Sequence, residues 1–245
     1  GQGKRMNSRL PKVLQPLAGQ PLLRHVVDCS REVGGDNLYI VYGHGGDRVR
    51  EAFDGESLNW TLQSQQLGTG HAVAQAMPQI DDGDRVLVLY GDVPLLSPVT
   101  LRALLETCPD TGLGVLTVDL PDPFGYGRIV RENGAVVRSV EQKDATEAEL
   151  AIHEINTGVV CAPAARLKSW VARLSADNAQ KEYYLTDIIA MAVEDGVAVH
   201  GVKANSEAEV MGINDKIQLA AGERALQRQR VDVLMSQGVG FADPA

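Results

Sequence analysis

Short apolar runs alternate with polar stretches of helical period through the first half of the chain. Runs rich in β-branched and aromatic residues predict strands at 38–42, 58–62, 85–90 and 114–118, and the intervening patterns predict helices at 22–33, 48–53, 71–77 and 98–108. Strands and helices that alternate at such short intervals predict an α/β fold with a doubly wound, mostly parallel, Rossmann-like sheet. The continuous run at 85–90 is typical of a parallel-sheet strand that is buried on both faces.

The second half has a different pattern. Asn133-Gly134 lies between two β-rich arms, which is a strong signal for an antiparallel hairpin. Further strands are predicted at 155–160 and 197–202, and helices at 145–150, 164–174 and 185–193. This half therefore predicts a mixed, partly antiparallel lobe. A long amphipathic stretch closes the chain, so we expect a domain at 1–214 followed by a helix and linker at 215–245.

Composition limits the classes of function. With 245 residues, of which 44% are hydrophobic and 22% charged, the chain can bury a sizeable core. A net charge of −9 argues against binding to an extended nucleic acid, and no apolar run approaches the ~20 residues that a membrane span needs. Cys29, Cys108 and Cys161 are far apart and form no CxxC pair. We therefore expect neither a disulfide framework nor a thiolate metal site, and a reducing cytoplasm fits best.

The first twelve residues contain a glycine-rich turn followed by cations. Gly1 and Gly3 allow a close approach of the backbone to an anion, and Arg5 and Lys12 add positive charge, so this segment is a candidate triphosphate site. A basic, flexible loop is an equally good interpretation of the segment alone. Because phosphate loops of this kind normally follow a buried strand, we expect such a strand to precede Gly1 in the parent protein.

Two further polar turns follow predicted strands and should meet the first at the carboxyl edge of the sheet. Tyr90-Gly91-Asp92 offers a carboxylate that suits Mg²⁺, although an aspartate here can also simply begin a turn. Gln63 precedes the Gly68-Thr69 turn, where amide and backbone groups could bind a pyrimidine, although glutamines at strand ends are usually solvated. We expect a structural role for the neighbouring histidine, His71.

Candidate groups for a sugar lie in the second half. Gly127 permits a close approach of a bulky ligand, and Glu141 and Asn156 offer groups for hydroxyls and an amide. The alternative for Glu141 is an exposed strand residue. Asn214 precedes the last helix, so N-capping is its default role and metal ligation the minority interpretation. Tyr183-Tyr184 is most simply interpreted as packing at a helix entry.

Taken together, these motifs resemble those of the sugar-phosphate nucleotidyltransferases, and among them the bacterial N-acetylglucosamine-1-phosphate uridyltransferases. The resemblance spans essentially the whole chain. It rests on GxGxRM with Pro11-Lys12, Gln63 with 66–72, Tyr90-Gly91-Asp92-Val93-Pro94, Gly125-Tyr126-Gly127-Arg128, Glu141 with Lys143-Asp144-Ala145, Glu154-Ile155-Asn156-Thr157-Gly158, Tyr183-Tyr184-Leu185-Thr186-Asp187, and Asn214.

The resemblance implies a role for each candidate residue. Gly1, Arg5 and Lys12 would hold the triphosphate, with Arg5 and Lys12 as the catalytic cations. Gln63, Gly68 and Thr69 would bind uracil, and the Tyr90-Gly91-Asp92 turn would contact substrate. The metal would be Mg²⁺, held by Asp92 and Asn214, while Gly127, Glu141 and Asn156 would bind N-acetylglucosamine.

The implied reaction joins UTP and N-acetylglucosamine 1-phosphate into UDP-N-acetylglucosamine with release of pyrophosphate, for cell-wall and lipopolysaccharide precursors in the bacterial cytoplasm. Members of this family also carry a C-terminal acetyltransferase β-helix domain, through which they form homotrimers. That domain is missing from this sequence, so acetylation is not expected of this chain.

Three alternatives stay open. Another sugar nucleotidyltransferase would use a different nucleotide or sugar, and a catalytically silent module would bind a nucleotide sugar without releasing pyrophosphate. A dinucleotide-binding domain is less favoured, because the chain lacks the full GxGxxG with an acidic residue ~20 positions further on.

Overall fold

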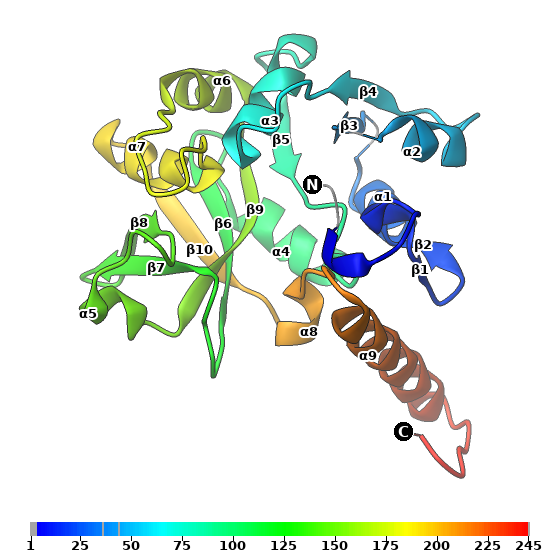
Figure 1. Ribbon diagram of the computed structural model, residues 1–245. Coiled ribbons are helices and arrows are strands. Elements are labelled where there is room, and N and C mark those ends of the chain that lie inside the picture. Colours follow the sequence, from blue (N-terminus) through cyan, green and yellow to red (C-terminus); the bar gives the residue numbers. More distant parts are fainter. Residues whose placement is uncertain (1–3, 36, 44, 245) are drawn as a thin grey trace.

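A six-stranded mixed sheet forms the centre of the molecule. The computed structural model describes residues 4–35, 37–43 and 45–244. The strands run in the order β10-β6-β9-β7-β8, and β5 also pairs with β9 (Figure 1). Their bounds are β5 Arg85–Val88, β6 Leu113–Asp119, β7 Gly127–Glu132, β8 Ala135–Val140, β9 Glu154–Pro163 and β10 Val199–Lys203. Two smaller sheets pair β3 (Tyr39–Tyr42) with β4 (Asn59–Leu62) and β1 (Pro16–Leu17) with β2 (Gln20–Pro21).

The helices begin and end near the predicted positions. They are α1 Leu22–Glu32, α2 Asp47–Ala52, α3 Thr69–Ala76, α4 Pro98–Thr107, α5 Glu147–Leu150, α6 Ala164–Arg173, α7 Ile188–Glu194, α8 Glu207–Val210 and α9 Lys216–Ser236, with short 3-10 turns at Lys4–Met6, Lys12–Leu14, Met77–Gln79 and Leu185–Asp187. Local chemistry explains the agreement. The Ser97 hydroxyl accepts the Val99 N–H at 3.1 Å and so begins α4, and Asn133 and Gly134 have φ of 49° and 84° in the β7-β8 hairpin.

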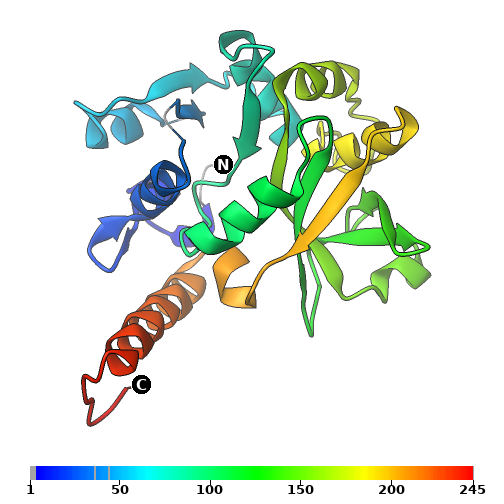
Figure 2. The same cartoon turned by 180° about the vertical axis from the view of Figure 1, so that it is seen from behind.

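Helices cover both faces of the sheet. On one face α6 and α7 pack against Val115 of β6 and Val160 of β9. On the other face α4 packs against Leu116 and Cys161, the next residues along the same two strands (Figures 1 and 2). Successive side chains of a strand point to opposite faces, so the two cores confirm the expected α/β fold with a doubly wound sheet.

The strand directions are more mixed than the sequence suggested. β5, β6 and β7 all run antiparallel to β9, so strands that share one direction are separated by a reversed one. Only β10-β6 and β3-β4 are parallel pairs among the described residues. The prediction that 85–90 is buried on both faces was wrong. Among the described residues β5 pairs with one strand only, β9, and its residues from Val86 to Val88 are only partly buried.

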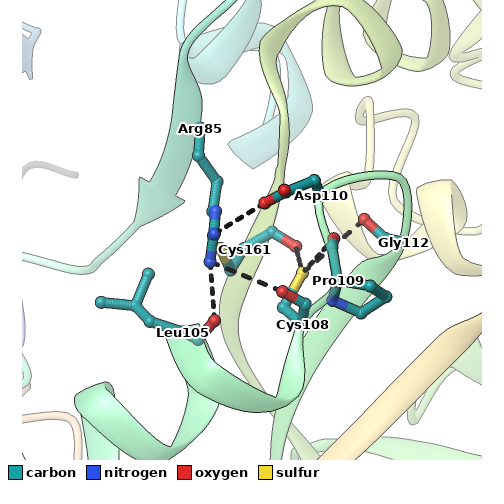
Figure 3. Close-up of polar contacts among 7 residues, drawn as sticks. All are labelled: Arg85, Leu105, Cys108, Pro109, Asp110, Gly112 and Cys161. Carbon is teal, nitrogen blue, oxygen red and sulfur yellow. Dashed lines mark hydrogen bonds and ion pairs between the residues drawn. The ribbon is translucent and has the colours of Figure 1, made fainter.

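Arg85 fixes the end of α4 against the central sheet. Its guanidinium donates to the carbonyl of Leu105 at 2.6 Å and to the carboxylate of Asp110 at 2.9 Å (Figure 3). Beside it, the Cys108 thiol donates to the carbonyl of Cys161 at 3.3 Å. All three cysteines of the chain are free and buried. The last carbonyls of α4 thus gain a cationic partner, which stabilises a helix C-terminus.

The final helix, α9, extends away from the body of the protein in both views (Figures 1 and 2). The prediction of an amphipathic helix was wrong. Gly222 is its one buried residue among those described, and Ile217 is 83% exposed. Only its first half is anchored, through Leu219, Ala225 and Leu226. In the described part of the chain, no helix has the combination of length and apolar character that a membrane crossing requires.

Candidate functional site

Three polar side chains from distant parts of the chain meet beyond the end of β5. The Lys12 ammonium forms an ion pair with the Asp92 carboxylate and donates to Asn214 Oδ1 at 2.9 Å. The Lys12 and Asp92 side chains are 15% and 20% exposed, so the pair is mostly shielded yet reachable. The structure therefore brings together three candidate residues that lie 80 and 202 positions apart along the chain.

Backbone contacts hold Asp92 and Asn214 beside each other. The Ile213 N–H donates to the carbonyl of Asp92 at 2.8 Å. The expected N-capping role of Asn214 was wrong, because the cap of α9 is Asp215, whose carboxylate accepts the Gln218 N–H at 2.8 Å. The Asn214 amide nitrogen instead donates to the Gly212 carbonyl at 3.2 Å, which turns Oδ1 toward Lys12.

The oxygens of Asp92 and Asn214 could hold a divalent cation. A carboxylate and an amide oxygen both face one cation, the Lys12 ammonium, and hard oxygen ligands are those that Mg²⁺ prefers. Within the described ranges there is no group of three or more His, Cys, Asp or Glu side chains that could hold a metal. A site with one or two protein ligands, completed by phosphates and water, is the usual arrangement for Mg²⁺.

The other residues of the candidate phosphate site are less defined. Arg5 is exposed in the Lys4–Met6 turn, and no hydrogen bond or ion pair joins it to another described residue. Gly1 lies outside the described residues. Gly91 belongs to the same turn as Asp92, and a Cβ there would contact Leu23 at 3.2 Å and Val13 at 3.4 Å. The first segment is anchored by Lys12 and also by Met6, which is 1% exposed in a core cluster with Leu17 and Ile213.

The Gly68-Thr69 loop, at the start of α3, is held by internal contacts. Gln63, just after β4, donates from Nε2 to the Gly68 carbonyl at 3.1 Å and to His71 Nδ1 at 3.0 Å. His71 therefore orients Gln63, a structural role, as expected. Because both partners use the amide nitrogen, the Gln63 carbonyl oxygen is left as an acceptor at the edge of the loop.

Gly68 is required for a contact within the protein. Its φ is 112°, and a Cβ would lie 2.6 Å from the carbonyl oxygen of Tyr183. The Thr69 hydroxyl is also used internally, because it accepts the Leu185 N–H at 3.1 Å. The backbone N–H groups of Gly68 and Thr69, which have no hydrogen-bond partner among the described residues, therefore remain available to a base.

Tyr90 lies between the two halves of the candidate site. Its ring packs so closely on Gly158 that a Cβ there would meet the phenol oxygen at 2.7 Å. Burial raises the pKa of Tyr90 to about 12, and a hydrogen bond with the Thr69 hydroxyl opposes part of that effect. Tyr90 is thus a neutral hydrogen-bonding group at neutral pH.

Gly127, Glu141 and Asn156 form the other end of the site. Gly127 pairs in register with Asn156, and a Cβ on Gly127 would lie 3.3 Å from Glu141 Oε1. Asn156 is only 6% exposed, and its Oδ1 accepts the Gly158 N–H at 2.8 Å. Its Nδ2 is buried without a partner among the described residues. A buried donor of this kind is costly unless a ligand accepts from it.

Glu141 is half-buried, unlike the exposed strand residue that was its alternative interpretation. It accepts a hydrogen bond from the Thr186 hydroxyl at 3.0 Å. Burial raises its pKa, against the effect of that bond, and the charges of Asp144 and Glu182 raise it further. Glu141 can therefore accept from a hydroxyl in a partly desolvated place.

Sequence reasoning missed the contribution of 183–187. Only Tyr183-Tyr184 was interpreted, as packing, and no role was assigned to Thr186 or Asp187. In the structure the Thr186 hydroxyl donates to Glu141, and burial together with the nearby Glu141 charge raises the pKa of Asp187. Thr186 belongs to a quoted motif, yet nothing in its spacing indicates that it faces Glu141, 45 positions away.

The sequence of this chain matches a family of known proteins and, over its whole length, a relative. Residues 1–184 match the MobA-like NTP transferase domain. The chain is 56% identical over 245 residues to the bifunctional protein GlmU of Janthinobacterium sp. (strain Marseille), in an alignment that covers 100% of this chain and 54% of that protein. The chain thus spans about half the length of this curated relative.

Solved structures show the same fold at low sequence identity. A UDP-glucose pyrophosphorylase in complex with UDP-glucose matches with a TM-score of 0.72 at 16% identity, covering 94% of this chain and 96% of that one. A nucleotidyl transferase from Methanothermobacter thermautotroptrophicus matches with a TM-score of 0.64 at 21% identity, covering 94% of each chain.

Proposed function

Because this chain belongs to the MobA-like NTP transferase family, we propose that it transfers the uridylyl group of UTP to N-acetylglucosamine 1-phosphate. The products are UDP-N-acetylglucosamine and pyrophosphate, and the relative that is 56% identical, a GlmU protein, supports this choice of substrates. The observation that carries the proposal is the convergence of Lys12, Asp92 and Asn214 beyond the end of β5.

In the proposed reaction, a phosphate oxygen of the sugar phosphate attacks the α-phosphorus of UTP in line. The new P–O bond forms as the bond to the β-phosphate breaks, and pyrophosphate carries away the electron pair. The nucleophile is already an anion, so the protein needs to supply position and positive charge, with no general base.

The cations of the first segment neutralise the phosphates. Lys12 would exchange its ion pair with Asp92 for a phosphate oxygen, and Arg5, which is exposed, is free to turn toward the same charge. We assign the cofactor as Mg²⁺, held by the oxygens of Asp92 and Asn214. When bound, it would neutralise charge that develops on the phosphate oxygens.

The two halves of the site bind opposite ends of the product. The Gln63 carbonyl oxygen would accept the N3–H of uracil, and the backbone of Gly68 and Thr69 would meet the base carbonyls. At the other end, Asn156 Nδ2 would donate to the sugar and Glu141 would accept from a hydroxyl. Gly127 leaves the room that this needs, and Tyr90 and Gly91, in the same turn as Asp92, would contact the substrate.

The remaining predictions are consistent with this assignment. We propose 1–214 as the nucleotidyltransferase domain and 215–245 as a helix and linker. The division is supported by the Asp215 cap and by the small anchored part of α9. Free, buried cysteines support the bacterial cytoplasm as the place of action. Assembly into a homotrimer through a further domain stays a prediction.

The direct test is pyrophosphate release by the 245-residue chain with UTP, N-acetylglucosamine 1-phosphate and Mg²⁺. We expect release that depends on both substrates and stops with EDTA. A parallel panel of nucleoside triphosphates and sugar phosphates identifies the preferred pair. Binding of the nucleotide sugar without any pyrophosphate release would replace the proposal with a binding module.

A further inference from the structure

Two loops that serve opposite halves of the site are joined by backbone hydrogen bonds. The Tyr183 N–H donates to the Leu67 carbonyl at 2.8 Å, and the Gly70 N–H donates to the Tyr183 carbonyl at 2.8 Å. Gly68, which lies between these bonds, has no room for a Cβ against Tyr183. The 67–70 loop, which faces the base, and the 183–186 segment are therefore a closely packed pair.

The Thr69 side chain adds a further link to this pair. Thr69 is the first residue of α3, and its hydroxyl oxygen accepts the Leu185 N–H across the two segments. Without the Thr69 oxygen, the Leu185 N–H would lose its partner at a residue that is only 1% exposed, and an unpaired buried donor is costly.

The next residue carries the link to the sugar half. Thr186 follows Leu185 directly, and its hydroxyl donates to Glu141 Oε1 at 3.0 Å. Leu185 is fixed in the core with α6 and α7, so the Thr186 backbone has little freedom to shift independently. A continuous path therefore runs from the Thr69 hydroxyl through Leu185 and Thr186 to the Glu141 carboxylate.

We propose that Thr69 is a positioning residue for the sugar phosphate through its hydroxyl, although the Thr69 backbone faces the base. It acts through the Leu185 N–H and Thr186 on Glu141. This inference rests on the proposed uridylyl transfer. It gives Thr69 two separate roles: its backbone binds the nucleotide, and its side chain helps to position the sugar phosphate.

The test compares Thr69→Val, which removes the hydroxyl at nearly constant volume, with Thr69→Ser, which keeps it. KM is measured for each substrate by pyrophosphate release. We expect Thr69→Val to raise KM for N-acetylglucosamine 1-phosphate about fivefold or more, with KM for UTP changed less than about twofold. Thr69→Ser should stay close to the wild type. Thr69→Ala, which adds no methyl group, replaces Thr69→Val if the valine variant does not fold.

A double-mutant cycle tests the path itself. Thr186→Val alone should raise KM for the sugar phosphate, and Thr69→Val in that background should add little, because both changes break one path. Effects that multiply, a rise in KM for UTP instead, or an unchanged KM in Thr69→Val would each overturn the inference while leaving the proposed function intact. A wild-type chain that releases no pyrophosphate would remove both.

Discussion

At the scale of single residues, the candidate site is recognisable by polar groups that the protein does not fully satisfy by itself. Asn156 Nδ2 is buried without a partner among the described residues, and the oxygens of Asp92 and Asn214 share one ammonium. Such groups are expensive to maintain unless a ligand uses them. Asp92 comes from the first half of the chain and Asn156 from the second, which supports a ligand that spans both halves.

Asp92→Asn tests the metal assignment with almost no change of shape. The substitution removes the negative charge that faces Lys12, so we expect Mg²⁺-dependent pyrophosphate release to fall by about 100-fold or more. Circular dichroism and thermal unfolding should show an intact fold. The matched control is Asp119→Asn, whose carboxylate pairs with Lys203 on an exposed edge of the sheet. Full activity in Asp92→Asn would exclude Asp92 as the metal ligand.

Asp187 gives the stability of the protein a predictable pH dependence. Burial raises its pKa from the ordinary value of 3.8 to about 6, and the charges of Glu141 and Asp144 act in the same direction. As the pH rises, Asp187 in the unfolded chain loses its proton near its ordinary pKa of 3.8, at a lower pH than Asp187 in the folded protein. The stability due to protonated Asp187 is therefore complete below about pH 4 and is lost as the pH rises through about 6.

Asp187→Asn should therefore raise the thermal unfolding midpoint more at about pH 8 than at about pH 5, because it removes the cost of a buried carboxylate. Differential scanning calorimetry at the two pH values measures this difference. An equal shift at both pH values would show that Asp187 titrates normally in the folded protein.

At the scale of elements, local signals placed most boundaries, and tertiary contacts decided what the turns do. Ser97-Pro98 and Asn133-Gly134 set a helix start and a hairpin as expected, because each depends only on neighbouring atoms. The Gly68 turn was expected to approach a ligand. Its glycine is also required by a contact within the protein, because a Cβ there would lie 2.6 Å from the carbonyl oxygen of Tyr183, which is far away in the sequence.

Gly68→Ala should accordingly destabilise the protein. Its Cβ would lie 2.6 Å from a backbone oxygen, and its φ of 112° is strained for alanine. We expect a loss of about 2–3 kcal/mol in the free energy of unfolding, measured with urea. Gly83→Ala is the control, because a Cβ at Gly83 meets nothing within 4 Å. If both variants unfold at the same urea concentration, the packed pair of loops is not rigid.

At the scale of the whole molecule, the first half of α9 packs against the segment that follows Lys12. The Glu223 carboxylate accepts the Ala18 N–H at 2.7 Å, and Lys216 donates to Gln15 Oε1 at 2.5 Å. Gly222 packs beside Leu17, where a larger residue would not fit against Ile213. These contacts hold the segment that carries Lys12 next to the one that carries Asn214.

Two truncations separate the anchored and exposed parts of α9. A chain that ends at residue 230 should keep its thermal midpoint and its pyrophosphate release, because the removed residues are mostly exposed. A chain that ends at residue 218 loses Gly222, Glu223 and Leu226, and its midpoint should fall by roughly 5–10 °C. Equal midpoints for the two truncations would show that α9 does not support the site.

The sequence by itself determined the α/β class, most helix starts, the hairpin and the identity of the candidate residues, because capping, turn chemistry and hydrophobic period act between near neighbours. Only the tertiary structure decided that β9 runs antiparallel to its neighbours and that β5 is only partly buried. It also decided that Asp215, and not Asn214, caps α9. It alone joined Lys12 to Asp92 and Asn214, and Thr186 to Glu141. Such contacts depend on the path of the whole chain through space, and no local pattern of residues encodes that path.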